Sequence, residues 1–223
     1  MFEKIKKGEG ACERVMRGTT PLMSKDTSLH VHYMKLTLIL LAAGNSRRFD
    51  GNKLLTPFHG KPMYQYIVEE VEKLPDGLFD DKIVVTQYPE IMEDLEKRGY
   101  VVVENVQSSL GISHSIHLAL EAAASPDGEE ASYCFAVCDQ PYLKAATIEG
   151  LIEGWRNSKR GIGCLCNMGE FGNPAIFSEA YRNELLALEG DVGGKRVLRR
   201  HIDDLYLHEV DDGLELVDID VRG

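Results

Sequence analysis

The chain has 223 residues, a formal net charge of −11 and a hydrophobic fraction of 43%, which suits a globular protein with one substantial core. The acidic balance excludes a general nucleic-acid binder, because such proteins need a basic surface. The longest apolar run, residues 36–43, is far shorter than the ~20 residues that cross a bilayer, so no membrane partner is expected.

Residues 1–33 differ from the rest of the chain. They are rich in Lys, Glu, Gly, Ser and Thr and show no sustained periodicity, whereas Met34 stands directly before the first strand-like run. Such a composition favours a disordered or non-native extension. We therefore expect residues 34–223 to form a single domain.

From Lys35 onward, apolar runs alternate with segments of helical periodicity. The first half is expected to contain strands at 35–41, 82–86 and 100–104, a loop at 42–61, and helices at 62–74, 89–98 and 113–124. The second half is expected to contain strands at 132–138, 161–166, 174–177, 205–209 and 214–219, and helices at 143–157, 178–188 and 193–202.

Local signals support two of these helix starts. Pro62 suits the first turn of one helix, and Ser113 is the expected N-cap of another. Strands that alternate with helices are typical of a parallel sheet whose faces are both covered. We predict a three-layer α/β fold, with a mostly parallel, Rossmann-like sheet and helices on both faces.

Three polar loops fall at the carboxyl ends of predicted strands, at residues 42–53, 105–113 and 139–141. In open parallel sheets, ligands bind outside the carboxyl ends of the strands. The three loops are therefore predicted to form one shared site.

The first loop joins small residues to cations. Small residues allow backbone N–H groups to approach an anion, and cations offset its charge. The loop is neither a Walker A nor a GxGxxG sequence, and a solvated basic turn is the alternative interpretation. The residues concerned are Ala42, Ala43 and Gly44, followed by Ser46, Arg48 and Lys53.

Two later segments are further candidates. Asp139 follows a central strand in Cys138-Asp139-Gln140-Pro141, where a simple turn cap is the alternative to a metal ligand. Residues 190–196 place glycines before a predicted helix and could cradle a second phosphate, unless Asp191 only caps a turn between helices.

The cysteines indicate reduced thiols. The chain contains five, an odd number, without a CxxC pair, and its first 20 residues lack the apolar segment of a secretory signal. These features predict a cytoplasmic protein. The strand positions of Cys134, Cys138, Cys164 and Cys166 favour buried core residues over a zinc site.

The sequence LAAGNSRRFDGNKLL at residues 41–55 resembles the LAAGxSxRMGxxKL motif of nucleotidyltransferases with a GT-A-like fold. Five later blocks follow in the family's order, and together they cover about 85% of the chain. The set is most similar to the molybdenum cofactor cytidylyltransferases, relatives of molybdopterin guanylyltransferase. The later blocks are GISHSI (111–116), CDQP (138–141), GNPAIF (172–177), GDVGGKRVL (190–198) and DID (218–220).

The resemblance implies a role for each matching residue. Leu41, Ala42, Ala43, Gly44, Ser46 and Ser113 would bind the nucleotide, and Arg48 and Lys53 would hold its triphosphate. Asp139 and Asp220 would bind Mg²⁺, and Gly172, Asn173, Pro174, Asp191 and Gly193 would line the acceptor side. Relatives with LAAG tend to use CTP and those with LAGG use GTP, so Ala43 favours CTP.

The chemistry of nucleotidyl transfer fits these residue types. An in-line displacement at phosphorus needs no protein nucleophile, only positioning and charge neutralisation. Mg²⁺ prefers carboxylate and phosphate oxygens and acts as a Lewis acid. The expected reaction transfers CMP from CTP to molybdenum-bound molybdopterin and releases pyrophosphate.

Departures from the motifs keep two alternatives open. Asp50 stands where the family has glycine, Asn173 stands where many relatives have histidine, and the chain stops at residue 223, short of the family's TPED. One alternative is transfer to another phosphorylated acceptor, such as a sugar or alcohol phosphate. The other is a non-catalytic cofactor-binding chaperone for a molybdenum hydroxylase, which Asp50 and the short C-terminus motivate.

Overall fold

The computed structural model describes residues 35–44, 52–123 and 131–219, which belong to one compact unit, Tyr33–Gly223. No helix within these residues is long and apolar enough to cross a membrane. Several predictions lie outside the described residues, namely those for residues 1–33, Ser46, Arg48, Asp50 and Asp220.

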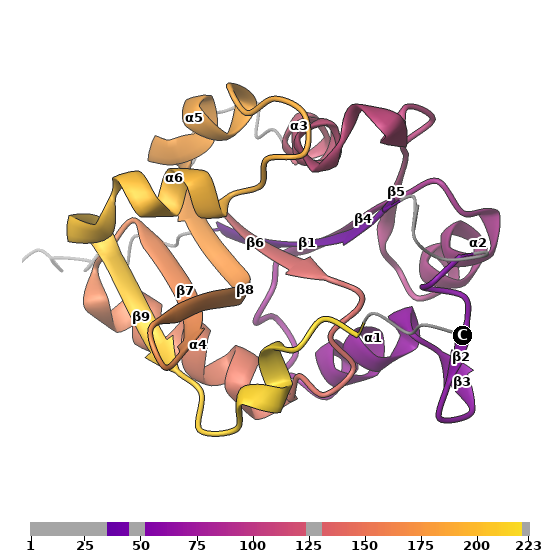
Figure 1. Ribbon diagram of the computed structural model, residues 1–223, viewed down its shortest axis with the longest axis horizontal. Helices are drawn as coiled ribbons and strands as arrows, with labels where there is room; N and C mark the ends of the chain where they lie inside the picture. Colours follow the sequence, from indigo (N-terminus) through magenta and orange to yellow (C-terminus); the bar gives the residue numbers. More distant parts are fainter. Residues whose placement is uncertain (1–34, 45–51, 124–130, 220–223) are drawn as a thin grey trace, which may run out of the picture. The chain divides into compact units, whose positions relative to one another are not determined.

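A seven-stranded sheet forms the middle layer, in the order β5-β4-β1-β6-β8-β7-β9 (Figure 1). Within the described residues, β8 alone runs antiparallel to its neighbours, and the other strand pairs of this sheet are parallel. The prediction of a mostly parallel α/β sheet is therefore confirmed. The strands are β1 (Lys35–Ala42), β4 (Asp81–Thr86), β5 (Val101–Glu104), β6 (Ala131–Val137), β7 (Ile162–Asn167), β8 (Glu170–Ser178) and β9 (Leu205–Glu209); β2 (Pro57–Phe58) and β3 (Lys61–Pro62) form a separate small hairpin.

Helices cover both faces of the sheet, as predicted (Figure 1). Side chains alternate along a strand, so β1 sends Leu38 and Leu40 to one face and Ile39 to the other. The first face is covered by α1 (Tyr64–Glu72), α2 (Pro89–Lys97) and α4 (Ala145–Ser158). The second is covered by α3 (Ile112–Ala122), α5 (Arg182–Leu186) and α6 (Lys195–Arg200).

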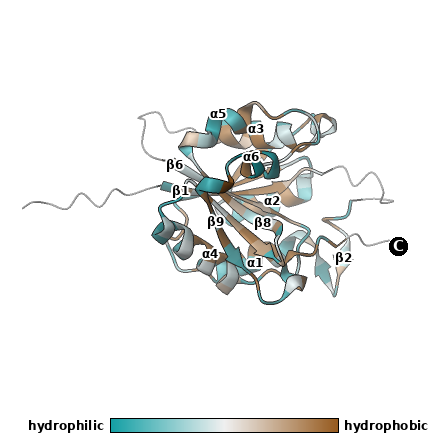
Figure 2. Ribbon diagram, turned by 60° about the vertical axis from the view of Figure 1, so that its left-hand side comes forward, coloured by the Kyte–Doolittle hydropathy of each residue, from teal (hydrophilic) through white to brown (hydrophobic). Residues whose placement is uncertain are grey.

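Strand β1 is apolar on both faces because both faces are covered. Leu38, Ile39 and Leu40 are each at most 1% exposed. Burying one such side chain contributes about 1.5–3 kcal/mol relative to leaving it in water. Figure 2 shows hydrophobic residues concentrated along these central strands. The residues that follow β1 therefore start from a rigid support.

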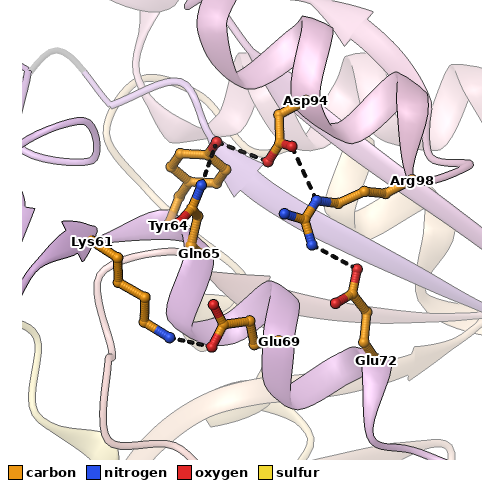
Figure 3. Close-up of polar contacts among 7 residues, drawn as sticks. All are labelled: Lys61, Tyr64, Gln65, Glu69, Glu72, Asp94 and Arg98. Carbon is orange, nitrogen blue, oxygen red and sulfur yellow. Dashed lines mark hydrogen bonds and ion pairs between the residues drawn. The ribbon is translucent and has the colours of Figure 1, made fainter.

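Polar contacts hold α1 and α2 together (Figure 3). The guanidinium of Arg98 lies 2.8 Å from Glu72 and 3.1 Å from Asp94, and the hydroxyl of Tyr64 donates to Asp94 at 2.8 Å. Lys61 and Glu69 form a further ion pair in the same view. Because Tyr64 is only 3% exposed, its bond is the best shielded of these contacts and fixes α2 beside α1.

The C-terminal strand predicted at residues 214–219 is wrong. Gly213–Leu216 form a short 3₁₀ helix, and no strand includes residues 217–219 within the described part of the chain. Leu214 and Leu216 are two positions apart, as apolar residues on one face of a strand would be, but Glu215 between them is 5% exposed and binds the start of α4. A tertiary contact thus overrides the local pattern.

The starts of two helices also differ from their predictions. Pro62 lies in β3, and α1 begins at Tyr64. The N-cap of α3 is Gly111 rather than Ser113, and no side chain caps that helix start. Gly111 has φ 93°, a conformation that glycine adopts without strain, and it places Ser113 inside the first turn.

The segment around β8 is more extended than predicted. Strand β8 begins at Glu170, because it pairs with β7 through a tight hairpin, and it continues to Ser178. A 3₁₀ turn at Glu179–Tyr181 and the five-residue helix α5 replace the helix expected at 178–188. Strand pairing with β6 and β7 therefore uses residues that local pattern assigned to a helix and a loop.

Candidate active site

The polar loops meet at one edge of the sheet because β1, β4, β5 and β6 run in the same direction (Figure 1). The last residue of β1, Ala42, lies opposite Thr86, and Thr86 lies opposite Glu104. On the other side, Leu41 lies opposite Val137 at the end of β6. The residues that follow each strand are therefore neighbours, as parallel topology requires.

Lys53 and Asp139 form an ion pair at this edge. The Nζ atom of Lys53 lies 3.0 Å from Oδ2 of Asp139, and the two side chains are 12% and 26% exposed. Both residues were singled out from the sequence for the same site, and the structure brings them together across 86 positions of sequence. The limited exposure strengthens the attraction relative to that of a surface pair.

A second carboxylate, Asp218, lies beside this pair. The backbone N–H of Ile219 donates to the carbonyl of Asp139 at 2.9 Å, which ties the C-terminal segment to the end of β6. Burial, and next the negative charge of Asp139, raise the pKa of Asp218, while Gln140, Lys195 and Lys53 act in the opposite direction. Two carboxylates and two lysines therefore share one electrostatic environment.

The resemblance to the family includes Asp218 without giving it a role and implies Asp220 as the metal ligand. Asp220 lies outside the described residues. The block Asp218-Ile219-Asp220 offers two carboxylates, and residues two apart on an extended chain point to one side. This spacing is the sequence signal that indicates Asp218 as a second candidate metal ligand.

Gln140 holds Asp218 in place. Its side chain is 3% exposed, and Nε2 donates to Oδ1 of Asp218 at 2.9 Å and to the carbonyl of Leu216 at 3.1 Å. Its Oε1 atom is buried and has no hydrogen-bond partner among the described residues. The sequence indicated Gln140 only as part of the Cys138–Pro141 block.

Glu215 anchors the same C-terminal segment to α4. Its carboxylate accepts from the backbone N–H of Lys144 at 3.1 Å and from Oγ1 of Thr147 at 2.6 Å, and it pairs with Nζ of Lys144 at 3.2 Å. Lys144 is the N-cap of α4, so Glu215 accepts from an N–H group at the helix start. The negative charge of Glu215 also interacts favourably with the positive end of the helix dipole.

The loop after β1 is held by the turn after β4. Three consecutive side chains, Thr86, Gln87 and Tyr88, donate to the carbonyls of Ala42, Ala43 and Gly44, at 2.9, 2.8 and 2.6 Å respectively. Burial raises the pKa of Tyr88, so its phenol stays protonated and remains a donor. None of these three donors was singled out from the sequence.

The predicted loop at residues 105–113 packs against the segment at residues 190–196. A Cβ atom on Gly111 would lie 2.4 Å from the carbonyl carbon of Gly190, so only glycine allows this approach. The backbone N–H of Ser113 donates to the carbonyl of Gly190 at 3.2 Å, and Ser113 is 3% exposed. The predicted nucleotide side and the predicted acceptor side are therefore in direct contact.

The remaining acceptor-side predictions fall in two places. Gly172, Asn173 and Pro174 lie within β8, and a Cβ atom on Gly172 would come within 2.7 Å of the Leu216 side chain. Gly193 lies beside Ile112, and Asp191 is exposed. Lys195, the first residue of α6, was not selected from the sequence, yet its charge acts on Asp218.

The four cysteines among the described residues are structural. Cys134, Cys138, Cys164 and Cys166 are free thiols and at most 2% exposed, as predicted. Burial raises the pKa of Cys134 to about 12, and burial followed by the charge of Asp139 raises that of Cys138 further. A thiol held protonated in this way is a poor nucleophile and a poor metal ligand.

Asp139 and Asp218 suit a metal ion that also binds phosphate. Within residues 35–44, 52–123 and 131–219, no group of three or more His, Cys, Asp or Glu side chains is arranged around a metal position. Mg²⁺ is commonly bound through one or two carboxylates together with substrate phosphates. Burial and then the negative charge of Asp139 raise the pKa of Asp218, and a divalent cation bound nearby would offset that repulsion.

The fold and this edge define a class of enzyme. A family model, the MobA-like NTP transferase domain, matches residues 38–205. The chain belongs to this family and contains a nucleotidyltransferase domain, which confirms the coarser part of the expectation from the motifs.

The chain is similar to one curated relative and to two solved structures in particular. The Bifunctional protein GlmU of Caldicellulosiruptor saccharolyticus is 30% identical over 152 residues, or 66% of this chain, and the chain spans 30% of the length of that relative. A nucleotidyl transferase from Methanothermobacter thermautotrophicus has a TM-score of 0.65 at 24% identity, over 83% of this chain and 91% of that one. Rv0371c from Mycobacterium tuberculosis, in complex with manganese, has a TM-score of 0.62 at 21% identity, over 80% and 89%. The two solved structures share the fold.

Proposed function

We propose that this nucleotidyltransferase transfers CMP from CTP to a phosphate of molybdenum-bound molybdopterin and releases pyrophosphate. The observation that carries the proposal is the ion pair between Lys53 and Asp139, with Asp218 beside it, at the edge where the loop of Ala42 to Gly44 ends. This arrangement offers carboxylates for a metal and a cation for phosphate within one site.

Asp139 and Asp218 are the described residues proposed to hold Mg²⁺, and Asp220 remains a proposed further ligand. Manganese in the related Rv0371c supports a divalent cation here. When bound, such an ion neutralises charge on the α-phosphate and on the departing pyrophosphate. Lys53, together with Arg48, is proposed to contact the leaving group, since its Nζ atom already lies 3.0 Å from Asp139.

The acceptor phosphate itself serves as the nucleophile. One of its oxygens forms a bond to the α-phosphorus as the bond from that phosphorus to the bridging oxygen of pyrophosphate breaks. The loop of Gly190 to Gly194 and Lys195 are proposed to position this anionic acceptor, because the loop packs on the start of α3 and Lys195 acts on Asp218. Catalysis then rests on alignment and charge rather than on a protein nucleophile.

The preference for CTP rests on Ala43. This residue is 4% exposed, and its methyl group takes room that the glycine of LAGG relatives leaves open. A pyrimidine needs less space than a purine, so the smaller base is the better fit. The wider family includes other acceptors, and a sugar phosphate or an alcohol phosphate belongs in any substrate panel.

The test is a reaction of the full chain with CTP, Mg²⁺ and molybdenum cofactor, followed by measurement of pyrophosphate and of the CMP-linked product. Asp139→Asn should abolish turnover, whereas Glu153→Gln, an exposed carboxylate change on α4, should not alter it. Release with a sugar phosphate but not with the cofactor would overturn the acceptor assignment. Tight cofactor binding without turnover would favour a chaperone.

A further inference from the structure

The end of β4 and the turn that follows it hold the end of β1 and the start of its loop through three side-chain bonds. Successive side chains donate to successive carbonyls, each pair 44 positions apart in the sequence. The set runs from Thr86 to Ala42, from Gln87 to Ala43 and from Tyr88 to Gly44. We call residues 86–88 the carbonyl clamp.

Because of peptide geometry, the direction of these carbonyls also fixes the direction of the N–H groups that follow them. A peptide unit is planar and trans, so the carbonyl of one residue and the N–H of the next point in opposite directions. The carbonyls of Ala42 and Ala43 point to the residues at the end of β4. The N–H groups of Ala43 and Gly44 must therefore point away from β4. Strand β1 lies between β4 and β6, so these N–H groups face the side on which Asp139 follows β6.

The carbonyl clamp is itself firmly held. Thr86 is fully buried, and its carbonyl accepts from the N–H of Asn105 at 2.8 Å. The N–H of Tyr88 donates to Oγ1 of Thr86 at 3.2 Å, and Tyr88 is also the N-cap of α2, with Pro89 next in the chain. Donor groups that are already fixed by a strand end and a helix start lose little conformational entropy when they bind their acceptors.

We propose that Gln87 and Tyr88 are positioning residues for nucleotide binding: Gln87 orients the peptide unit that carries the N–H of Gly44, and Tyr88 fixes the carbonyl of the same glycine, so that this N–H group faces the nucleotide before it arrives. The inference rests on the proposed binding of CTP at this edge. Neither side chain needs to touch the nucleotide. Their contribution is preorganisation, which improves affinity by removing the cost of ordering the loop on binding.

The test uses single-group deletions and equilibrium binding. Tyr88→Phe removes the hydroxyl that donates to Gly44 and accepts a 3.3 Å contact from Gln87, and Gln87→Ala removes the bond to Ala43 together with that contact. One neutral hydrogen bond corresponds to a change of about two- to tenfold in an equilibrium constant. We expect Kd for CTP with Mg²⁺, measured calorimetrically without acceptor, to rise by about three- to tenfold in each variant. In turnover, KM for CTP should rise while kcat at saturation stays the same.

Tyr66→Phe is the matched control. Its hydroxyl also donates to a backbone carbonyl, that of Phe58, at 2.6 Å, but it supports the small hairpin of β2 and β3. This variant should leave Kd for CTP unchanged. A purely structural role for the clamp would lower the melting temperature and kcat without moving KM.

The outcomes separate the two claims. If wild-type protein binds CTP and both clamp variants bind it equally well, the positioning role is wrong and the proposed function stands. If wild-type protein binds none of CTP, GTP, UTP and ATP with Mg²⁺, the proposed function fails and the positioning role fails with it. A rise in Kd confined to Tyr88→Phe and Gln87→Ala, with Tyr66→Phe unaffected, supports the inference.

Discussion

Replacement of Gln140 by leucine should weaken both the fold of the C-terminal segment and the metal site. Two bonds from Nε2 are lost, one to the carbonyl of Leu216 and one to the carboxylate of Asp218. A hydrogen bond between neutral groups contributes about 1 kcal/mol to stability, and a hydrogen bond to a charged group contributes roughly twice that. Leucine also removes the buried, unpartnered Oε1 atom, which offsets part of the loss. We expect a net destabilisation of about 1–2 kcal/mol by urea unfolding, or a fall in melting temperature of about 3–6 °C.

The same substitution should raise Kd for Mn²⁺ in the presence of CTP by about tenfold, because Asp218 loses the bond that orients it. Gln65→Leu provides a control, since the side chain of Gln65 makes a long, 3.4 Å contact with the hydroxyl of Tyr64 and no other hydrogen bond to the described part of the chain. Unchanged stability together with unchanged Mn²⁺ affinity in Gln140→Leu would refute the assigned role of Gln140.

Three further changes test neighbouring claims. The pKa of Asp218 is raised in the folded protein, so its ionised form costs stability at neutral pH, and that cost disappears as pH falls from the raised pKa toward the ordinary aspartate value. Asp218→Asn should therefore raise the melting temperature of the metal-free protein at pH 7, by an amount that shrinks on acidification, while it abolishes Mn²⁺ binding; a lower melting temperature would contradict this sign. Lys195→Ala should raise KM for the acceptor by about tenfold with little change in KM for CTP, and equal changes in both would argue against its acceptor role. In a Cys12→Ser variant, Cys134, Cys138, Cys164 and Cys166 should resist alkylation at pH 8 until urea unfolds the protein, because they are buried and their pKa values are raised; rapid labelling of the native protein would show otherwise.

The central strand and its charged neighbours were accessible from the sequence for definite reasons. The run from Leu36 to Leu41 lacks alternation, which is typical of a strand covered on both faces, and the structure buries both faces. Lys53 and Asp139 could be connected because each follows a predicted parallel strand, and parallel topology brings such positions to one edge.

The residues that sequence reasoning missed act through contacts that local patterns do not encode. The carbonyl clamp depends on the register between β1 and β4, which sets Thr86 opposite Ala42. The strand predicted at 214–219 failed because Glu215 binds the start of α4, some 70 positions earlier in the chain. The place of Asp218 beside Asp139 depends on the bond from the N–H of Ile219 to the carbonyl of Asp139, a contact between distant parts of the chain.

The most direct test of nucleotidyl transfer follows the phosphorus atoms of CTP. With Mg²⁺ and molybdenum cofactor, label in the α-phosphate should move to the cofactor, and label in the γ-phosphate should leave as pyrophosphate. Asp139→Asn should abolish both movements. Transfer of the γ-label to the cofactor, or no transfer of the α-label to any phosphorylated acceptor by active protein, would contradict the proposed chemistry.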